Sequence, residues 1–451
     1  MPSYFRNRRD EISFGARWRV LVMALSLMAM GLAAAEPELI SSAGSGRATA
    51  YVESPKIITR EGLTHMAWLD SEAEGFRVRI RTRDNATGTW GEVVTLGEAQ
   101  DNHGGPALTI DEAGYLHVLY YSHHHPFRYR RSVRPNDATA WMAYEEFGHN
   151  LTYPALVCTR DGTLIMAARR SYEDQPWELE MWTKRPGGAW QAQGPILRSR
   201  QGNYAQFAAS LAWSPDHETL HLGARIYEMR PDDSTWNATG IVYLRSEDDG
   251  ATWRNAIGEA VTVPATLDTV TPLAVGSIEQ GRVLNGGSID VGPQGEVAVP
   301  YSVRVDDSAQ SYVALRQPGA PEWRHRWLNR YLPSAWSDAA VMAHGGAAFD
   351  EAGKLTVLAV VLRMDPDSTA WGEPSMEIVR FVSVDGGASF NSEIVGSVDP
   401  DVPHWMPNVE RRTGFNAVPN GNSFIYTGGE RGASLTDQLT NQVWWVPADV
   451  D

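Results

Sequence analysis

The sequence of 451 residues predicts an all-β fold, a β-propeller of seven four-stranded blades, and three observations carry this prediction. A polar turn that feeds a β-rich run recurs seven times along the chain, and so does an aromatic residue that closes a later Gly-containing turn. No long amphipathic helix interrupts either series. Repeats of this kind bury a continuous core between neighbouring units, as propeller blades do.

The first series consists of turns in which Gly, Asn or another polar residue precedes a run of β-branched, aromatic and aliphatic residues. The runs that we expect to be strands are 63–68, 115–120, 163–168, 219–224, 296–301, 354–360 and 422–427. The closing aromatics are Trp90, Trp141, Trp190, Trp253, Trp323, Phe390 and Trp445. Spacings of about 50 to 70 residues leave room for four strands per repeat.

Two repeats are more specific than the others. Residues 246–253 and 383–390 each follow the pattern Ser-x-Asp-x-Gly-x-Thr/Ser-aromatic, which is the Asp-box hairpin. In that turn the Ser and Asp side chains bond the local backbone, and the aromatic ring packs between sheets. Asp248 and Asp385 are therefore expected to be structural and not catalytic.

The N-terminus predicts export. Basic residues precede an apolar run of about 13 residues, too short to span a membrane, and Ala33, Ala34 and Ala35 follow it. We expect a signal peptide at 1–35 and one catalytic propeller domain at 36–451, secreted or periplasmic, soluble and monomeric. Cys158 is the single cysteine, so no intramolecular disulfide supports the fold.

The charge of the chain restricts its partners. The formal net charge is −16, and residues 1–35 carry five Arg and two acidic residues, so the remainder carries −19. Such acidity disfavours nucleic acid, and an anionic polymer would need a local basic cleft. Basic residues gather between residues 102 and 170: His103, His117, His123, His124, His125, Arg128, Arg130, Arg131, Arg134, His149, Arg160, Arg169 and Arg170.

The same stretch carries the residues of a recognisable pattern. Its parts are Asn102-His103-Gly104-Gly105-Pro106, Gly114-Tyr115-Leu116-His117-Val118, His123 with Pro126, Tyr129, Arg131 and Ser132, Thr152-Tyr153-Pro154, Asp161-Gly162, and Arg169. Together they resemble the BNR-repeat propeller lyases, which include the ulvan lyases. The resemblance is close over about residues 95–230 and extends elsewhere only as repeat architecture.

The resemblance implies a site. His103, His123, Tyr153 and Arg169 match residues that act at the scissile bond, with Arg169 neutralising the uronate carboxylate. Substrate contacts are expected from Tyr204, Arg225, Asn102 and Arg128. The substrate would be an acidic, uronate-containing polysaccharide such as ulvan, cleaved by β-elimination to unsaturated uronate ends.

Elimination chemistry explains these residue types. The proton on C5 of a uronate is removed and the oxygen on C4 is expelled, so the carboxylate is neutralised first, which an Arg fork does well. His and Tyr serve as base and acid. We expect neighbouring cations such as Arg169 to lower the pKa of Tyr153, and the sequence leaves open which of His103 and Tyr153 is the base.

Simpler interpretations exist for each residue. His103 could cap a turn, Tyr153 could be a buried residue at a strand start, and Arg170 could face the cleft in place of Arg169. His124 and His125 could be structural, and consecutive residues of a regular strand face opposite ways, so three consecutive His do not ligate one ion. No metal is needed for the elimination, while a structural zinc or calcium is compatible with the sequence.

Two other functions fit the repeat. A sialidase-like glycoside hydrolase shares the Asp-box, but an early Arg-Ile-Pro motif does not occur in the first repeat. A non-catalytic carbohydrate-binding propeller would keep a basic, aromatic cleft without the His and Tyr pair. The products separate these alternatives from a lyase.

Overall fold

The computed structural model describes residues 36–229, 236–277, 281–305, 308–342, 345–363, 374–396, 402–418, 422–430 and 436–448. The predicted signal peptide at 1–35 lies outside the described residues, and Ala35–Asp451 forms one compact unit. In the part of the chain that is described, no helix is both long and apolar enough to cross a membrane.

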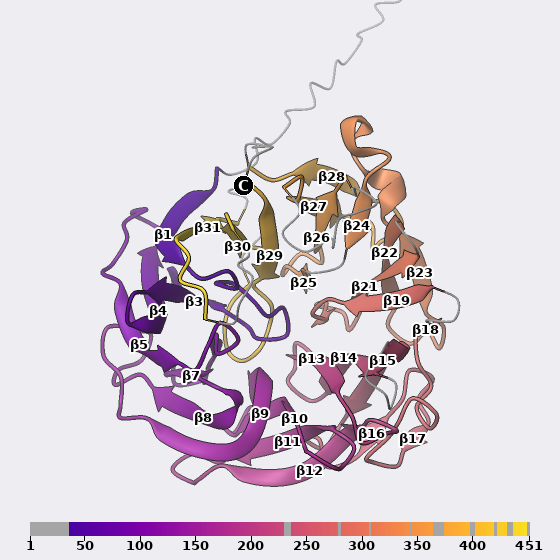
Figure 1. Ribbon diagram of the computed structural model, residues 1–451, viewed down its shortest axis with the longest axis horizontal. Coiled ribbons are helices and arrows are strands. Elements are labelled where there is room, and N and C mark those ends of the chain that lie inside the picture. The colour runs from indigo at the N-terminus through magenta and orange to yellow at the C-terminus, as the bar shows by residue number, and fades with distance from the viewer. Residues whose placement is uncertain are drawn as a thin grey trace, which may run out of the picture. The chain divides into compact units, whose positions relative to one another are not determined.

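The fold is all-β, as predicted. Two short 3-10 helices, η1 (Asn329–Tyr331) and η2 (Ser334–Trp336), are the helical elements among the described residues, and the other regular elements are strands. The strands follow one another around a common centre within the compact unit (Figure 1).

Hydrogen bonding joins the described strands into five antiparallel sheets. The first runs in the order β29 (His404–Val409), β30 (Phe424–Gly428), β31 (Asn441–Val446), β1 (Glu38–Gly44), β3 (Leu63–Glu72), β4 (Gly75–Asp84) and β5 (Val94–Ala99), with β2 (Ile57–Arg60) on β3. The second contains β6 (Ala107–Ile110), β7 (Leu116–Tyr120), β8 (His123–Arg131), β9 (Glu145–Cys158), β10 (Leu164–Arg170), β11 (Glu178–Lys184) and β12 (Gln191–Arg198) in chain order.

The other three sheets are shorter. The third contains β13 (Ala205–Trp213), β14 (Leu220–Met229), β15 (Trp236–Ser246), β16 (Trp253–Arg254) and β17 (Ala260–Val261), with β18 (Ala274–Ser277) on β15. The fourth contains β19 (Arg282–Gly286), β21 (Val297–Val305), β22 (Ser308–Arg316) and β23 (Arg324–Trp327), with β20 (Asp290–Val291) on β21. The fifth contains β24 (Ala340–Met342), β26 (Leu355–Leu362), β27 (Glu377–Ser383) and β28 (Asn391–Ile394), with β25 (Ala347–Phe349) on β26.

All seven runs expected from the turn pattern form strands, namely β3, β7, β10, β14, β21, β26 and β30. The turns before the first six of these strands contain a residue at positive φ, which Gly adopts without a Cβ clash, whereas residues 420 and 421 of the expected turn before β30 lie outside the described residues. Gly62 before β3 has φ +80°, and Gly353 before β26 has φ +83°. The turn residues of the sequence therefore predict the first residue of each strand to within one or two positions.

The number of hydrogen-bonded sheets is smaller than the predicted number of repeats because neighbouring repeats share edge bonds. β8 pairs with β9, which joins the second and third repeats into one sheet. β1 pairs with β31 and contacts β3 at one position, so the N-terminal strand lies between the last and the first repeat. This pairing connects the two ends of the compact unit.

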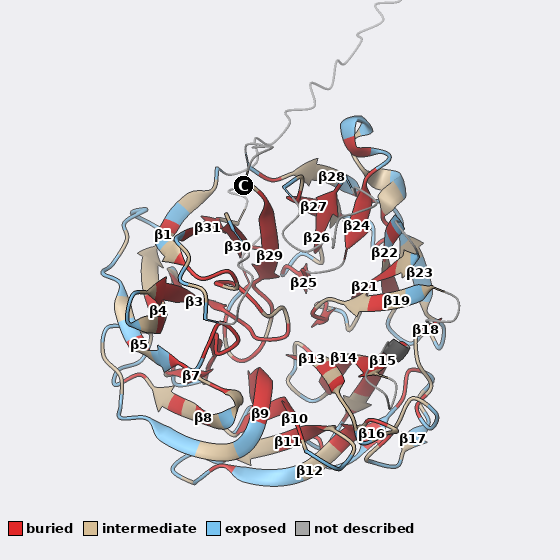
Figure 2. Ribbon diagram, in the orientation of Figure 1, coloured by how far each residue is buried: buried red, intermediate tan, exposed pale blue. Residues whose placement is uncertain are grey.

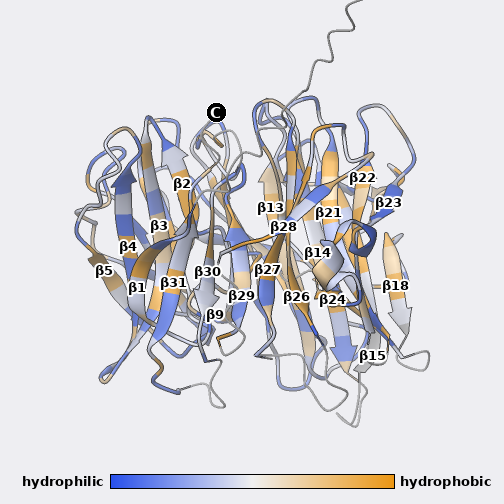
Figure 3. Ribbon diagram, turned by 90° about the horizontal axis from the view of Figure 1, so that it is seen from above, coloured by the Kyte–Doolittle hydropathy of each residue, from blue (hydrophilic) through white to orange (hydrophobic). Residues whose placement is uncertain are grey.

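Burial explains how the sequence forms inner and outer strands. All eight residues of β26 are buried, whereas β4 alternates buried Phe, Val and Ile with partly exposed Arg. A strand that is covered on both faces needs a continuous apolar run, and a strand with one solvated face needs alternation. Figure 2 shows buried residues toward the centre of the sheets and exposed ones on the outer strands, and Figure 3 shows the apolar character of β21 and β26.

The turns at residues 246–253 and 383–390 have matching hydrogen bonds. Ser246 Oγ donates to Asp248 over 2.7 Å and accepts from the Gly250 amide, while Thr252 N donates to Asp248 over 2.8 Å. Residues 383–389 repeat this set of bonds. Trp253, which follows the first turn, is 2% exposed. The carboxylate of Asp248 is thus occupied by its own turn.

Candidate active site

A cavity of about 430 Å³ brings together four of the eight predicted site residues, namely His103, Tyr153, Tyr204 and Arg225. Its lining consists of Arg47, Ala50, Tyr51, Val52, Glu53, His103, Tyr153, Tyr204, Gln206, Ala208, Arg225, Tyr227, Val283, Asn285, Gly286 and Met406. These residues come from the loop that follows β1, the turn between β5 and β6, strands β9, β13, β14 and β19, the residue before β13, and β29. A cavity of this size and mixed polarity is typical of a ligand site.

One wall is the loop that follows β1. It is held in place through its backbone: Asn408 Nδ2 donates to the carbonyls of Tyr51 and Ser54 over 3.1 and 3.0 Å, and Arg411 donates to the Glu53 carbonyl over 2.6 Å. Because the side chains of Asn408 and Arg411 bind the backbone, those of Arg47, Tyr51 and Glu53 are left to line the cavity.

The second wall centres on a carboxylate between two histidines. Asp101 accepts from His103 Nδ1 over 3.1 Å and from His123 Nδ1 over 2.5 Å, and the two imidazole rings stack 3.9 Å apart. Asp101 also accepts from the His103 amide over 2.7 Å, which fixes the turn between β5 and β6. Position 104, which follows His103, requires glycine, because a Cβ there would lie 2.5 Å from the Tyr121 carbonyl oxygen.

The hydrogen bonds fix the protonation of His103. Burial lowers the pKa of His103 to about 4, with Arg47 and His123 acting in the same direction, so the ring is neutral at neutral pH. Nδ1 carries the proton that Asp101 accepts, and Nε2 is the acceptor. The Arg47 guanidinium donates to this Nε2 and also to the Tyr51 hydroxyl.

The three consecutive histidines do not alternate as a regular strand would require. His124 has φ +59°, and the pairing of β8 with β9 shifts register between His123 and His125. As a result the rings of His123 and His124 lie 4.5 Å apart on the same side. The expectation that neighbouring histidines face opposite ways is wrong here, because a break in the strand turns His124 toward the site.

Tyr153 reaches the cavity through a bulge. Thr152 pairs with Arg169 and Ala155 pairs with Ala167, so Tyr153 and Pro154 together oppose one residue of β10. Pro154 has no amide proton for the ladder, and Tyr153 has φ +61°. The Thr-Tyr-Pro sequence therefore turns a residue in the middle of β9 toward the cavity while leaving it only 4% exposed.

The electrostatics of Tyr153 differ from the expectation. Burial raises the pKa of Tyr153, and the nearby Arg169 and Arg47 lower it without compensating fully. The effect of the cations has the predicted sign, but desolvation outweighs it, so the phenol is protonated at neutral pH. Its ring also meets Tyr51 edge to face at 4.4 Å.

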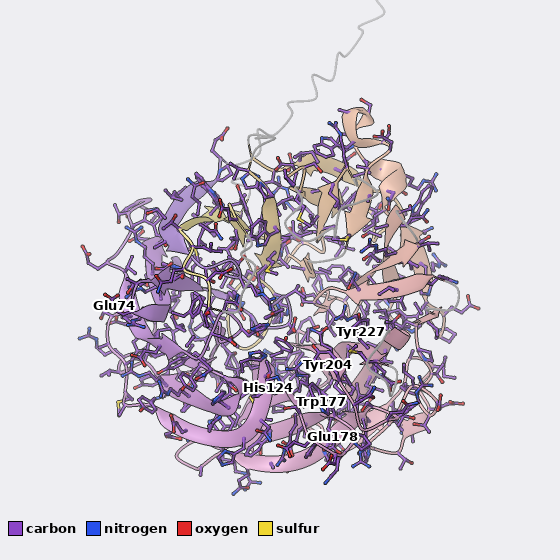
Figure 4. The ribbon with its side chains drawn as sticks, viewed as in Figure 1. Glu74, His124, Trp177, Glu178, Tyr204 and Tyr227 are labelled. Carbon is purple, nitrogen blue, oxygen red and sulfur yellow. The ribbon has the colours of Figure 1, made fainter. Side chains whose placement is uncertain are left out.

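Arg169 lies behind Tyr153 among aromatic rings. Its guanidinium carbon is 4.6 Å from the centre of the Tyr153 ring and 5.0 Å from that of Trp177, and it donates to the Tyr204 hydroxyl over 3.5 Å. His124 Nε2 lies 3.2 Å from the same guanidinium. Figure 4 shows His124, Trp177 and Tyr204 close to one another, and the Trp177 ring lies 5.7 Å from that of His124 and 4.9 Å from that of Tyr204. Arg169 is 1% exposed and does not line the cavity.

Arg170 points the other way, as the alternation of β10 requires. It forms an ion pair with Glu180 over 2.8 Å and lies over the Tyr172 ring. Arg169 is thus the inward-facing member of the pair.

The opposite wall of the cavity carries a second arginine. Arg225 on β14 donates to Gln206 on β13 and to Asn285 on β19, and its guanidinium lies over the Tyr227 ring at 4.9 Å. Tyr204, just before β13, lines the cavity between this arginine and the Arg169 cluster. Two of the four predicted substrate contacts, Tyr204 and Arg225, therefore line the cavity.

Asn102 and Arg128 are not among the lining residues. Asn102 is buried beside His103, and Arg128 pairs with Glu146 over 3.0 Å between the rings of Tyr121 and Tyr144. Other arginines of the basic stretch, Arg130, Arg134, Arg160 and Arg170, likewise bind carbonyl or carboxylate oxygens. The arginines that line the cavity are Arg47 and Arg225, both outside the stretch in which a basic cleft was expected.

Sequence reasoning missed several members of the site. Arg47, Tyr51 and Glu53 precede the first repeat, and no pattern in the sequence marks them. Asp101 could have been found, because an Asp two residues before a His in a Gly-rich turn is typical of a side chain that bonds the following backbone.

One group in the described chain has the donor atoms for a metal ion. The ligand atoms of Asp101, His103 and His123 lie within 4.8 Å of one another. Zinc binds such oxygen and imidazole donors, but it would have to replace the two protons that Asp101 accepts. In this structure Asp101 instead accepts hydrogen bonds from Nδ1 of both histidines.

A larger cavity of about 670 Å³ lies beside β18, β19 and β21–β23. None of the predicted site residues lines it, and its His325 is bonded through Nδ1 to the Tyr301 hydroxyl over 2.7 Å. The smaller cavity is the candidate active site because four of the predicted site residues line it.

The sequence profile described as "BNR repeat-containing family member" matches residues 63–331. An ulvan lyase of Nonlabens ulvanivorans is 21% identical over 400 residues, covering 80% of each chain. The ulvan lyase PL25 of Pseudoalteromonas sp. (strain PLSV) is 19% identical over 325 residues, and the match covers 63% of each chain.

A solved structure is similar over most of the chain. It is a PL25 ulvan lyase bound to -[GlcA(1-4)Rha3S]-, with a TM-score of 0.68, 15% identity, and coverage of 92% of this chain and 96% of that one. At this identity the likeness shows a common fold.

Proposed function

This chain belongs to the BNR repeat-containing family, and we propose that it is a polysaccharide lyase that cleaves an acidic, uronate-containing glycan by β-elimination. One observation carries the proposal: a single cavity holds a neutral histidine, a protonated tyrosine and two arginines. Elimination from a uronate needs a base, an acid and a cation for the carboxylate, and these groups supply all three.

The protonation states of His103 and Tyr153 suggest which of them is the base and which is the acid. His103 is neutral and has an acceptor at Nε2, so it is suited to remove the proton from C5. Tyr153 keeps its proton, so it is suited to protonate the oxygen that leaves C4. The C5–H electron pair becomes the C4–C5 double bond as the C4–O bond breaks, and no water is consumed.

His123 and Asp101 act on His103. Asp101 holds the His103 tautomer that leaves Nε2 unprotonated, and the stacked His123 ring fixes the orientation of the carboxylate. The role resembles that of a carboxylate which orients a catalytic imidazole in hydrolases. Such a step needs no metal ion or cofactor.

Ulvan or a related rhamnose-uronate polymer is the substrate that the relatives favour, since the proteins to which this chain is similar are ulvan lyases. The partner would be the acidic polysaccharide, with no role for nucleic acid or a membrane. Arg225, with Gln206 and Asn285, and Tyr204 would bind the sugar on the far side of the cavity.

We infer that the working protein is a secreted or periplasmic monomer, produced by cleavage of a signal peptide after Ala35. We also infer that the sheets correspond to seven propeller blades with Asp-box turns at 246–253 and 383–390. Seven turn-and-strand repeats and the hydrogen bonds of those two turns support this architecture.

The test is ultraviolet absorbance from C4–C5 unsaturation, with the mature protein incubated with ulvan and other uronate polysaccharides. We expect rising absorbance with at least one polymer, and a loss of about 10² to 10⁴ in rate in Tyr153→Phe. Tyr129→Phe is a matched control, since that hydroxyl binds His117 away from the cavity. Saturated ends would indicate a hydrolase, and binding without cleavage would indicate a carbohydrate-binding propeller.

A further inference from the structure

A buried carboxyl group in the wall of the cavity has an oxygen without a hydrogen bond. Glu53 lines the cavity and is 2% exposed. Its Oε1 atom is enclosed and accepts no hydrogen bond from a residue that the structure describes. Because Oε1 is enclosed, Oε2 is the oxygen that a ligand in the cavity can reach. Buried polar groups are normally hydrogen-bonded, so an exception at a binding cavity calls for an explanation.

A second buried glutamate shows the usual arrangement. Glu410 is 1% exposed, and its two carboxyl oxygens accept from the amide and the hydroxyl of Thr59 over 2.5 and 2.7 Å. Asn416 and Ser423 donate to the same carboxyl group over 3.2 and 3.1 Å. Burial raises the pKa of both glutamates to about 7, so the two groups are similarly desolvated and differ in their hydrogen bonds. The fold satisfies Glu410 internally, whereas the Glu53 carboxyl faces the cavity.

The backbone at Glu53 is fixed, which fixes the origin of its side chain. Arg411 donates to the Glu53 carbonyl over 2.6 Å and to the Val52 carbonyl over 3.3 Å. Arg411 is itself 1% exposed, so solvent does not compete for these bonds. A side chain that extends from a fixed backbone into a cavity loses little conformational freedom when a ligand binds.

The charges around Glu53 favour its neutral form when a polyanion is bound. Burial raises the pKa of Glu53, while its own amide, Arg225 on β14, Lys56 in the same loop and Arg411 after β29 oppose the rise only in part. Tyr51 is a further titratable neighbour, and burial raises its pKa, so it remains uncharged. An anionic group that binds near Arg225 offsets the main cation in the cavity wall and shifts Glu53 further toward the acid. A neutral carboxyl group has an O–H donor, which a carboxylate lacks.

We propose that Glu53 is a substrate-binding residue whose carboxyl group donates a hydrogen bond to an oxygen of the acidic glycan bound beside Arg225. The inference rests on the proposed function, because it takes the ligand to be an acidic glycan. Glu53 needs its proton for this bond, so protein in which Glu53 is ionised takes up a proton from solvent when the glycan binds. The contribution of Glu53 to affinity is therefore complete below about pH 6 and falls as the pH rises above about 7.

Calorimetry with ulvan oligosaccharides tests this assignment, in a Tyr153→Phe background that keeps the ligand intact. Titrations at pH 8 in two buffers of different ionisation enthalpy count the protons taken up. We expect a net uptake of up to about one proton per bound glycan, and none after Glu53→Gln, because an amide donates without titrating. Glu53→Leu removes the donor and should lower the affinity at pH 6 by about 2- to 10-fold, the usual contribution of one hydrogen bond.

Glu410→Gln is the matched control, since burial raises its pKa equally but its carboxyl group is bonded within the fold. It should change neither the proton uptake nor the affinity. Proton uptake that persists in Glu53→Gln assigns the proton to another group, such as Lys56, and overturns the proposal. An affinity at pH 6 that Glu53→Leu leaves unchanged, or no binding in the Tyr153→Phe background, also overturns it. If Glu53→Leu does not fold, the proton count in Glu53→Gln decides alone.

Formation of unsaturated product by the wild type is measured separately. If no such product forms while proton uptake depends on Glu53, the lyase function fails and the binding role of Glu53 stands. If the product forms and proton uptake does not depend on Glu53, only the present inference fails.

Discussion

Replacing Asp101 by Asn should disable the site with little change in shape. The carboxylate accepts from Nδ1 of both His103 and His123, over 3.1 and 2.5 Å, whereas an amide has one acceptor oxygen. The amide nitrogen must then face one of the two rings as a donor. If that ring is His103, its proton moves to Nε2, where it meets the N–H donors of Arg47.

The size of the effect follows from these bonds. A hydrogen bond to a charged group contributes about 1.5 to 3 kcal/mol, and one or two such bonds are lost with the correct tautomer. At about 1.4 kcal/mol per factor of ten, kcat/KM should fall by about 10² to 10⁴. Burial opposes ionisation of Asp101, but hydrogen bonds from His103 and His123 outweigh it and lower its pKa, so the stabilisation is fully present above about pH 5 and is lost as the pH falls. The stability difference between the wild type and the variant should therefore shrink in acid.

The assay is the initial rate of unsaturated product formation, with thermal unfolding measured from pH 3 to 8. Asp111→Asn is the matched control, because Asp111 accepts from the buried His117 over 3.2 Å in the same sheet but away from the cavity. We expect Asp111→Asn to lower stability and to keep kcat/KM within about twofold of the wild type. An Asp101→Asn variant with more than a tenth of the wild-type kcat/KM would refute the tautomer argument.

Three further changes have defined outcomes. Arg128→Ala should leave kcat/KM unchanged and cost at most about 1 kcal/mol, since its partner Glu146 is half exposed; a large loss of activity would place Arg128 in the site after all. Burial raises the pKa of Glu53 to about 7, so ionising Glu53 destabilises the fold as the pH rises above about 4.5. In denaturant titrations, Glu53→Gln should therefore raise the free energy of unfolding by about 1 to 3 kcal/mol at pH 8 and leave it unchanged at pH 4. An equal rise at both pH values would contradict this. Trp253→Ala should cost about 3 to 5 kcal/mol in the same titrations, against about 0.5 kcal/mol or less for Val384→Ala, which is 80% exposed.

Local sequence signals were sufficient for the strands and turns. Gly62 and Gly353 mark positions where only positive φ allows the chain to turn, and the run that forms β26 is apolar throughout because both of its faces are covered. Such information is carried by a few neighbouring residues, so it can be read without the rest of the fold. The division of the chain into hydrogen-bonded sheets could not be predicted from the sequence, because it depends on edge pairing between repeats, as between β8 and β9.

The site was predictable in part. His103, Tyr153, Tyr204 and Arg225 were selected on a family resemblance, and the fold brings all four to one cavity. Arg47 was missed, because it reaches the cavity from a loop held by side-chain bonds from residues about 360 positions away.

Two further errors have physical causes. The pKa of Tyr153 depends on desolvation, which requires knowledge of the packing, and adjacent charge alone suggested the wrong net direction. The direction in which the His124 side chain points depends on a break in β8, where His124 has a positive φ. The periodicity of a regular strand does not predict such a break.

The central claim is that the cavity breaks its substrate by elimination and without water. The most direct measurement is the mass of the products formed from one defined uronate oligosaccharide in ¹⁸O-labelled water. Elimination predicts that the product masses add up to that of the substrate, with no label other than the anomeric oxygen that a reducing end exchanges with water. Products that together exceed the substrate by one labelled water would show hydrolysis and contradict the account.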